Sequence, residues 1–405
     1  MIWISTFCYT GYVLDKPIKV RIEGIVAGGA GLARVGGKSV FIEGGIPGEI
    51  VICSITEEHR TWSQAQLLDI EEASPDRVQP ACGLYGTCGG CNMQHLAYPT
   101  QLVAKTAILR DAFARIGGKN PPEPLVFPSE PWEYRNRMQF HAVKHRSGGE
   151  SGPFWGLKAR KSAEIVPIPD CPIADPGIRR LLRSDSRQPR PSIPPDKDRF
   201  TVYARGDTFL SEGDHSRGKV RVLDRELALD AGVFFQGNGA MLEKLIVSLH
   251  EIAAGIAADI ATRNLPLADL YCGVGTFATF LGELFPGVDL VEENKASLAL
   301  ARENLAWHQS ANFFALRSEN WAKNSDSRRY GLVIADPPRQ GLSRSLASHL
   351  ASAGPTALAY VSCDPATLAR DSKTLLAGGY KLQKLHFYDF YPQTAHIEGL
   401  AFFKK

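Results

Sequence analysis

The stretch Asp269-Leu-Tyr-Cys-Gly-Val-Gly-Thr-Phe277 follows an apolar run and leads into a helical pattern. Gly273 and Gly275 let the backbone of such a strand-to-helix turn approach a ligand closely. A dinucleotide site prefers a third glycine, and this chain has Ala278 there. Glu292 ends the next apolar run about 20 residues further on, where an acidic side chain can hold ribose hydroxyls. The stretch predicts a site for an adenosine-containing cofactor, and both NAD and S-adenosylmethionine fit it. The alternative for Glu292 is an exposed acid at a helix start.

Outward from this stretch, apolar runs of strand length alternate with helical patterns from about Ala231 onward. Four such runs are Leu265–Tyr271, Val288–Glu292, Gly331–Asp336 and Ala357–Cys363. Alternation of this kind predicts a mostly parallel sheet with helices on both faces. The last two runs, Lys381–Phe390 and His396–Lys405, are joined by YPQTA and can form an antiparallel pair at one edge. We therefore predict an α/β, Rossmann-like domain over residues 231–405.

Two of these runs end in polar loops, Asp336-Pro-Pro-Arg339 and Ser362-Cys-Asp-Pro365. In open α/β sheets, ligands bind beyond the carboxyl ends of the strands. The cofactor stretch, Asp336 and Cys363 are therefore expected to face one crevice. A lone cysteine is usually buried and inert. At this edge of the sheet we favour a nucleophile for Cys363 over a filler of the core.

Four of the eight cysteines form a pattern of their own: Cys82, Cys88 and Cys91 lie within ten residues, and Cys171 follows downstream. Disulfides are disfavoured because Met1–Leu14 lacks the features of a secretion signal. Clustered thiolates suit a metal. Three closely spaced cysteines with a distant fourth are typical of an iron–sulfur cluster, and four cysteines also make a structural zinc site. The spacing leaves both open.

The N-terminal part differs from the rest. Between Ile18 and Ile70, short strands are broken by glycine turns, which suggests a small closed barrel of the oligonucleotide-binding kind. Another small β domain is the alternative, and the strands alone do not separate the two. We predict a tail at 1–14, this barrel at 15–73, and a β-rich central domain with the cysteine cluster at 74–230. A Ser/Arg/Pro-rich stretch, Arg180–Arg199, is predicted to be a loop.

Composition sets few limits. The chain has 405 residues, 44% hydrophobic and 22% charged, with a formal net charge of +3, which is ordinary for a globular protein. No run of about 18 uncharged apolar residues predicts a membrane span. Cytoplasmic location and a monomer are the default expectations. Basic residues gather between Trp132 and Lys161, either as a solvated face or as a contact for nucleic acid.

A set of motifs occurs in order along nearly the whole chain. They are Tyr134-Arg-Asn-Arg137, Phe235-Gln236, Leu270-Tyr-Cys-Gly-Val-Gly275, Asp336-Pro-Pro-Arg339, Ser362-Cys-Asp-Pro365 and His396-Ile-Glu398. With them the sequence resembles the RNA uracil-5-methyltransferase family, specifically its branch acting on 23S ribosomal RNA. The N-terminal strands then resemble a TRAM domain. The four cysteines match the family's 4Fe–4S ligands, which favours iron–sulfur over zinc.

The resemblance also implies site residues. S-adenosylmethionine is the cofactor, with contacts expected from Gln236, Tyr271, Gly273, Glu292 and Asp336, and in some members from Thr276 and Asn320. Cys363 is the implied nucleophile and Glu398 the general base. RNA is the implied partner.

The implied chemistry explains why a thiol and a base are needed. Carbon 5 of uracil is too weak a nucleophile to attack a methyl sulfonium, and a thiolate added to carbon 6 turns carbon 5 into an enolate carbon that can attack. The proton on carbon 5 must then leave to a base. Glu398 starts an otherwise apolar strand, an awkward place for a carboxylate without a task, although a salt-bridged edge residue is the alternative. His396 should share its face by the two-residue period.

Two departures from the family pattern stand out. Asp364 replaces the usual asparagine, and a carboxylate beside Cys363 is expected to raise the pKa of the thiol. The Phe-Gln motif continues as Gly237-Asn238-Gly239, a looser sequence than usual. Three other functions remain open: methylation of a transfer RNA loop uridine, amino-group methylation, which also uses Asp-Pro-Pro loops, and RNA binding without catalysis.

RNA recognition is expected to use the N-terminal barrel and the basic stretch Arg135–Lys161, because a uridine must leave its stack to reach Cys363. Phe140, Phe154 and Trp155 are candidates for stacking on bases, with core packing as the alternative for each.

Overall fold

The computed structural model describes six segments of the chain: residues 17–118, 120–143, 154–184, 198–213, 215–324 and 330–405. The expected tail at 1–14 and the middle of the Arg180–Arg199 stretch lie outside these residues. The chain divides into two compact units. Unit 1 holds the described residues up to Ala81 together with Asn92–Ala104 and Gln393–Ala395, and unit 2 holds the rest. In the described part of the chain, no helix has both the length and the apolar character to cross a membrane.

Unit 1 contains a six-stranded sheet in the order β1-β5-β6-β4-β3-β2. Its strands are β1 (Ile18–Arg21), β2 (Gly24–Ile25), β3 (Gly31–Val35), β4 (Lys38–Glu43), β5 (Ile50–Glu58) and β6 (Trp62–Glu72). Neighbours pair antiparallel except β4 and β6, which are parallel. Gly36 and Gly37, with φ of 55° and 83°, make the tight turn between β3 and β4 that such a hairpin needs.

The sheet of unit 1 curls around its own core, because β1 also contacts β3. Alternate residues of the strands point inward, as Val40 and Ile42 do on β4. The strands predicted between Ile18 and Ile70 are therefore present. Their assignment to a TRAM domain stays a prediction.

The largest sheet of unit 2 has eight strands in the order β17-β16-β15-β18-β19-β21-β20-β7. They are β7 (Leu125–Phe127), β15 (Leu267–Leu270), β16 (Val288–Val291), β17 (Ala311–Phe314), β18 (Leu332–Ala335), β19 (Ala357–Ser362), β20 (Lys381–Tyr388) and β21 (Glu398–Lys404). The first five strands in this order are mutually parallel, and β21 runs antiparallel to both β19 and β20. The predicted parallel sheet and its antiparallel pair are confirmed, but β7, from far earlier in the chain, pairs parallel with β20 and takes the edge position.

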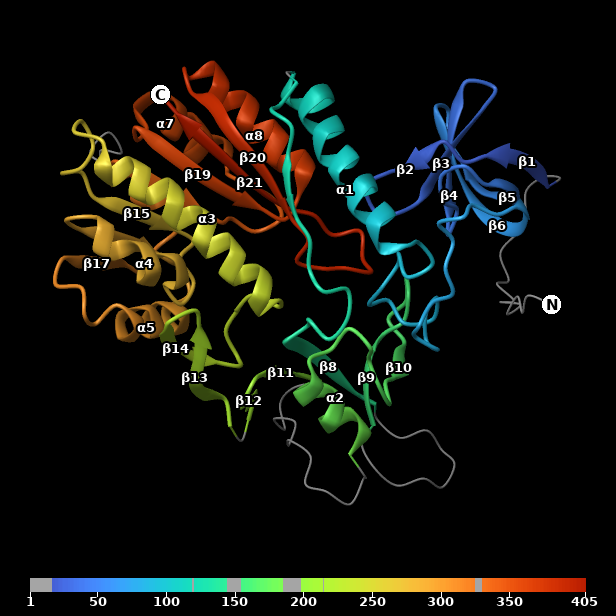
Figure 1. The fold of residues 1–405 in the computed structure, drawn as a ribbon, viewed down its shortest axis with the longest axis horizontal. Helices are drawn as coiled ribbons and strands as arrows, with labels where there is room; N and C mark the ends of the chain where they lie inside the picture. Colours follow the sequence, from blue (N-terminus) through green and yellow to red (C-terminus); the bar gives the residue numbers. More distant parts are fainter. Residues whose placement is uncertain (1–16, 119, 144–153, 185–197, 214, 325–329) are drawn as a thin grey trace. The chain divides into compact units, whose positions relative to one another are not determined.

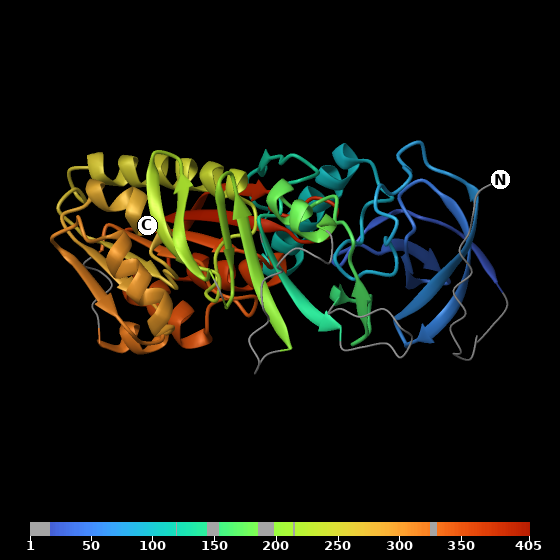
Figure 2. The ribbon, with the colours of Figure 1, turned by 90° about the horizontal axis from the view of Figure 1, so that it is seen from below.

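Helices alternate with these strands along the chain, as Figures 1 and 2 show in the colours from yellow to red. They are α3 (Gly239–Ala258), α4 (Thr276–Leu281), α5 (Lys295–Asn304), α6 (Ser318–Asn324), α7 (Arg344–Ala353) and α8 (Pro365–Ala377). Residues of α3, α4 and α5 share one hydrophobic core with the sheet, whereas α7 packs on α6 and α8. The helices thus form two groups around a doubly wound, Rossmann-like sheet.

A second sheet of unit 2 has the order β10-β9-β8-β11-β12 and is antiparallel throughout. Its strands are β8 (Arg137–Val143), β9 (Phe154–Lys158), β10 (Ile165–Pro167), β11 (Arg199–Arg205) and β12 (Thr208–Ser211). The other elements are α1 (Tyr98–Ala112), the π-helical turn η1 (Phe113–Gly117), α2 (Pro176–Arg183), the hairpin of β13 (Arg217–Val222) and β14 (Arg225–Asp230), and the 3-10 turn η2 (Gly282–Leu284).

The aromatic residues of this second sheet correct one expectation. Phe140 is 0% and Trp155 4% exposed, and both pack with Phe200 in the core beneath the sheet. They point inward because the strands alternate inward and outward residues. The proposal that these two rings stack on RNA bases is therefore wrong. The side chain of Phe154 lies outside the described residues.

Candidate active site

The polar residues singled out in the α/β half gather at one edge of its sheet. β15, β16, β18 and β19 are parallel, so the residues that follow them, including Glu292, Asp336 and Cys363, meet at their common carboxyl end. β21 runs the other way and begins at this edge. Ser362 pairs with Gly399, which brings the preceding residue, Glu398, beside Cys363.

The loop between β15 and α4 has the backbone shape that its glycines predict. Gly273 and Gly275 have φ of 54° and 76°. Space is also short at Gly275, where a Cβ would lie 2.9 Å from Leu305 Cδ1. Tyr271 has φ of 62°, a conformation that non-glycine residues adopt rarely and mostly at functional sites. The loop is therefore held in a strained, exposed-backbone shape suited to ligand contact.

Glu292 fixes this loop. Its carboxylate accepts the N–H of Gly273 at 3.1 Å and that of Asn294 at 2.7 Å. Asn294 in turn caps α5 by accepting the N–H groups of Ala296 and Ser297. Glu292 thus connects the end of β16 with the cofactor loop, and it is not the plain exposed helix-start acid of the alternative interpretation.

Carboxyl groups dominate the charge around the loop. Buried Asp269 accepts the N–H of Ala278 at 3.2 Å, the first turn of α4. Burial raises the pKa of Asp269 to about 8, and the charges of Asp336 and Glu292 add to the rise. Burial also raises the pKa of Asp336 to about 7. The positive sulfonium and ammonium groups of S-adenosylmethionine would lower these raised pKa values and favour the ionised acids, whereas the pyrophosphate of NAD would raise them further. The electrostatics therefore favour the second of the two cofactors.

The other expected cofactor contacts lie as follows. Thr276 is half-buried at the start of α4, and Gln236 is half-buried before α3. The Tyr271 hydroxyl forms a hydrogen bond with Ser318, at the start of α6. Asn320, two residues on, is exposed. The structure thus brings α6 to the cofactor loop through Ser318.

The Phe-Gln motif is joined to the Tyr-Arg-Asn motif through the backbone. The N–H of Asn136 donates to the carbonyl of Gly237 at 3.0 Å. Asn238 caps α3 by accepting the N–H of Met241 at 3.2 Å, and its amide donates to Ser129 and to the carbonyl of Phe390. The unusual Gly-Asn-Gly sequence therefore makes a tightly bonded helix start.

Cys363 and Glu398 form the core of the site. Burial, then the charges of Glu398 and Asp336, raise the pKa of the half-buried Cys363 thiol to about 12, while Arg339 opposes them. Glu398 is 4% exposed. Burial and the neighbouring Asp336 raise the pKa of Glu398 well above its usual value. At rest Cys363 is therefore a neutral thiol, and the ionised form of its neighbour Glu398 is disfavoured.

The predicted influence of Asp364 on Cys363 needs correction. Its carboxylate accepts the N–H of Thr367 at 2.8 Å and caps α8, with Pro365 in the first turn. The carboxylates that raise the pKa of the Cys363 thiol are Glu398 and Asp336. Asp364 has a structural task because the nucleophile loop runs straight into a helix.

His396 also differs from expectation. β21 begins at Glu398, so His396 lies in the preceding loop and is exposed, whereas Glu398 is buried. The two-residue period does not extend across the loop. Arg339 Nη2 lies 3.3 Å from His396 Nδ1, which joins the Asp-Pro-Pro-Arg loop to the His-Ile-Glu loop.

Sequence reasoning missed Tyr391, which precedes the His-Ile-Glu loop. Its ring packs edge-on against His396, with the ring centroids 5.6 Å apart. The Tyr391 hydroxyl oxygen lies near Gly237, since a Cβ added to that glycine would be 3.5 Å from it. In the sequence Tyr391 is the first residue of YPQTA, which was predicted only to connect two strands.

The four clustered cysteines are all half-buried and free of disulfides. Cys88 and Cys171 pack against the core of the second sheet, and the N–H of Gly90 donates to the Cys88 sulfur at 3.4 Å. Burial, and to a smaller degree Cys88 and Cys82, raise the pKa of Cys171 to about 11. Within the described segments, no three or more His, Cys, Asp or Glu side chains form a group that could hold a metal ion.

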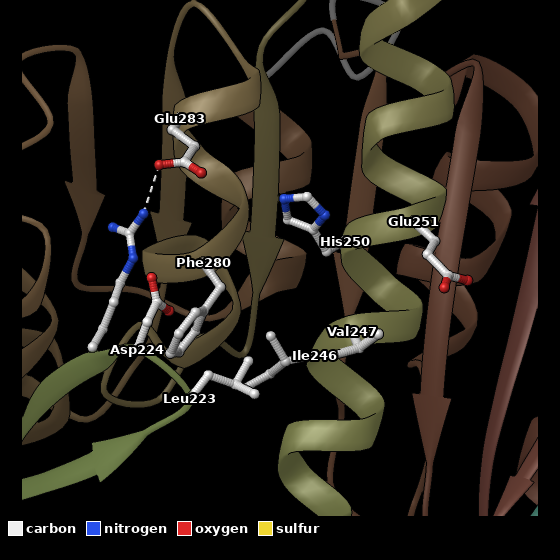
Figure 3. Close-up of a pocket in the computed structure, with 9 residues that line it drawn as sticks. Leu223, Asp224, Ile246, Val247, His250, Glu251, Phe280 and Glu283 are labelled. Carbon is white, nitrogen blue, oxygen red and sulfur yellow. Dashed lines mark hydrogen bonds and ion pairs between the residues drawn. The ribbon is translucent and has the colours of Figure 1, made fainter.

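One cavity of unit 2, of about 210 Å³, lies away from these residues. Figure 3 shows it between α3 and the β13–β14 turn, with Val247, His250 and Phe280 among its lining residues and an ion pair to Glu283 at its side. None of the candidate site residues lines it.

Known proteins similar to this chain include RNA methyltransferases that act on uracil. Residues 200–405 match the family model described as tRNA (Uracil-5-)-methyltransferase. An uncharacterized RNA methyltransferase of Treponema denticola is 34% identical over 95% of this chain and 98% of its own length. The 23S rRNA (uracil(1939)-C(5))-methyltransferase RlmD of Shewanella woodyi is 31% identical over 96% of each chain.

A solved structure shares the fold. The tRNA (uracil-54, C5)-methyltransferase of Pyrococcus abyssi, in complex with S-adenosyl-L-homocysteine, aligns with a TM-score of 0.70 and 22% identity. The alignment covers 95% of this chain and all of the other.

Proposed function

Because this chain belongs to the tRNA (uracil-5-)-methyltransferase family, we propose that it methylates carbon 5 of a uridine in 23S ribosomal RNA through a covalent bond to Cys363. At the coarser level it is an RNA uracil-5-methyltransferase that uses S-adenosylmethionine. The observation that carries the covalent mechanism is the pairing of β19 with β21. It sets Cys363 beside the buried acid Glu398, at the strand ends where the cofactor loop also lies.

Cys363 begins the reaction by bonding to carbon 6 of the uracil. The ring's C5=C6 electrons move toward carbon 5 and the carbonyl oxygen O4. Because ionised Cys363 is disfavoured beside Glu398 and Asp336, its proton leaves as the bond forms. Burial raises the pKa of Asp336 to about 7, which makes it a stronger base than an exposed aspartate, and its ionised form can accept the proton.

S-adenosylmethionine supplies the methyl group to carbon 5. Gln236, Tyr271, Gly273, Glu292 and Asp336 are the residues proposed to hold it, with Thr276 and Asn320 at the margin of the site. The carboxylates of Glu292 and Asp336 would complement its positive charges.

Glu398 completes the reaction by taking the proton from carbon 5, after which the bond between sulfur and carbon 6 breaks. A raised pKa makes Glu398 a stronger base than an exposed glutamate. Amino-group methylation would need neither this base nor the thiol. Amino-group methylation therefore leaves Cys363 and Glu398 without a role.

The choice of 23S ribosomal RNA rests on the relatives. RlmD of Shewanella woodyi matches 96% of this chain, including the N-terminal strands, whereas the family model with tRNA in its description matches only residues 200–405. Transfer RNA is the alternative substrate, supported by the likeness to the Pyrococcus abyssi fold. The TRAM-like sheet is proposed to contact the RNA.

We assign Cys82, Cys88, Cys91 and Cys171 to a 4Fe–4S cluster. All four are half-buried, and Cys88 and Cys171 pack against the core of the second sheet, where burial disfavours free thiolates but suits thiolates bound to iron. Anaerobically purified protein is expected to be brown with about four irons per chain. Stoichiometric zinc would overturn this assignment.

The mechanism is tested by two variants with a matched control. Cys363→Ala is expected to lower methylation to background, a loss of roughly 10⁴-fold or more. Glu398→Gln is expected to accumulate an RNA–protein adduct that survives denaturation, because the carbon 5 proton cannot leave. Cys53→Ala, a cysteine change in the core of unit 1, should keep full activity. An active Cys363→Ala protein contradicts the mechanism.

The substrate is tested by mass-spectrometric mapping of methyluridines in RNA from cells lacking the gene. Loss of a single 23S methyluridine supports the proposal. Loss of a tRNA methyluridine, with ribosomal RNA unchanged, would move the assignment to transfer RNA.

A further inference from the structure

The segment Asp389–Pro392 of unit 2 is unusually well anchored. The buried Lys105 ammonium donates to Asp389 Oδ1 at 2.7 Å and to the carbonyl of Tyr391 at 3.1 Å. Both side chains of this ion pair are 0% exposed. The Tyr134 hydroxyl donates to the carbonyl of Pro392 at 2.8 Å. The backbone of Tyr391 is therefore fixed on both sides, so its side chain has a defined place.

The phenol of Tyr391 lies among the catalytic groups. Its oxygen end lies over Gly237, beside the Phe-Gln motif, and its ring packs against His396. The charged and titratable groups whose charges act on it are Glu398, Cys363, Arg135 and Arg137. Burial, followed by Glu398, raises the pKa of the phenol to about 12. At neutral pH it is therefore a hydroxyl that can donate a hydrogen bond.

The reaction needs a donor of this kind. When sulfur bonds to carbon 6, electrons shift through carbon 5 and carbon 4 onto O4, which becomes negative. Glu398 must be ionised to act as the base, so it cannot stabilise that charge, which has the same sign. A preorganised donor aimed at the developing oxyanion lowers the barrier of the step.

We propose that Tyr391 is a further catalytic residue whose hydroxyl donates a hydrogen bond to O4 of the target uracil and stabilises the enolate. The tyrosine stays protonated throughout, so no proton changes hands at O4. This role rests on the proposed function, because it needs the covalent addition of Cys363. It also adds to specificity: O4 of uracil accepts the hydrogen bond, whereas the amino group of cytosine at the same position cannot.

The test compares Tyr391→Phe with Tyr203→Phe. Tyr203 also carries a buried phenol in unit 2, its hydroxyl has no hydrogen-bond partner, and it lies in β11 within the core. Tyr391→Phe is expected to slow single-turnover methylation by roughly 10²-fold, the usual loss of one oxyanion donor, with KM for RNA changed less than about threefold. Tyr203→Phe should react at the wild-type rate.

A second readout isolates the addition step. Without S-adenosylmethionine, addition and reversal exchange the hydrogen at carbon 5 with solvent, so tritium release from [5-³H]uridine RNA reports enolate formation. Tyr391→Phe should slow this release by the same factor as methylation. If release is unchanged while methylation slows, Tyr391 acts elsewhere and the proposal is wrong.

Replacing O4 by sulfur completes the design. On RNA with 4-thiouridine at the target, a weak acceptor takes the place of O4, so the penalty of Tyr391→Phe should fall from about 10²-fold to less than tenfold. An unchanged penalty overturns the contact with O4.

If wild-type protein methylates no uridine, the proposed function itself fails. If Tyr391→Phe methylates at the wild-type rate, the role of Tyr391 is wrong while the proposed function stands.

Discussion

Two buried glutamates, one in each unit, are held in opposite ways. Glu49 of unit 1 is 0% exposed and accepts hydrogen bonds from the N–H of Ile46 at 3.1 Å and from Arg77 at 2.5 and 2.7 Å. Glu398 of unit 2 is 4% exposed, and the charges it faces are Asp336, of the same sign, and Arg339. The first carboxylate is compensated, and the second is placed against a like charge.

The difference separates structural from catalytic burial. A buried charge with a bonded partner serves the fold, because removing the partner leaves an unpaired charge. A buried acid beside another acid weakens the fold locally, and such an arrangement persists at sites where a shifted pKa serves chemistry. Burial alone, which both residues share, does not distinguish the two roles.

The sharpest test changes each glutamate to glutamine. Glu49→Gln should destabilise unit 1 by roughly 3 kcal/mol, the lower end for a broken buried pair, because Arg77 keeps some exposure. Glu398→Gln should leave the stability of unit 2 equal or higher while methylation stops. Hydrogen-exchange mass spectrometry separates the two units, through β5 and β6 in one and β19 and β21 in the other.

Equal losses of stability in the two variants would break the comparison. The outcome would mean that Glu398 is compensated in solution and that its partners hold the ionised form.

The second prediction concerns pH and Asp269. The folded pKa of Asp269 is about 8 and the unfolded value is about 3.9. Between these values the unfolded chain loses the proton that the folded chain keeps, so stability falls as pH rises from about 4 to about 8. Asp269→Asn cannot titrate. Its loss of unfolding free energy between pH 5.5 and 7.5 should therefore be smaller than that of wild type by about 2–3 kcal/mol.

Denaturant unfolding at the two pH values measures this difference. Asp259→Asn is the matched control, because the backbone N–H of Ala261 and the Lys404 ammonium lower the pKa of that half-buried carboxyl. Its pH dependence over this range should equal that of wild type. An equal slope for Asp269→Asn would show that Asp269 is ionised in the folded protein.

The sequence predicted the parts of this site that follow from strand periodicity and motif order. The edge of the sheet that collects Glu292, Asp336 and Cys363 follows from the alternation of strands and helices, and the place of Glu398 from the final antiparallel pair. These features depend on contacts along the backbone, which a pattern of apolar residues determines.

What the sequence did not predict depends on side-chain direction. Phe140 and Trp155 point into the core, and His396 lies outside the strand that carries Glu398. The backbone carbonyl of Tyr391 accepts a hydrogen bond from Lys105, which lies far back in the chain. Such contacts join residues nearly 300 positions apart, and no local period encodes them.

The smallest expected effect concerns Asp364. Its carboxylate resembles that of Glu49, because both accept hydrogen bonds that stabilise the fold. Asp364→Ala removes the cap of α8 and should lower stability by about 1 kcal/mol. Asp364→Asn keeps a capping oxygen and removes the charge, so it should be as stable as wild type and methylate RNA within about twofold of the wild-type rate. The pH–rate profile should also stay in place, since Glu398 and Asp336 are the carboxylates that act on the Cys363 thiol. Asp364→Asn could instead react tenfold faster, with its pH–rate profile moved to lower pH. Asp364 would then be one of the carboxylates that raise the pKa of the Cys363 thiol, and capping α8 would be only part of its role.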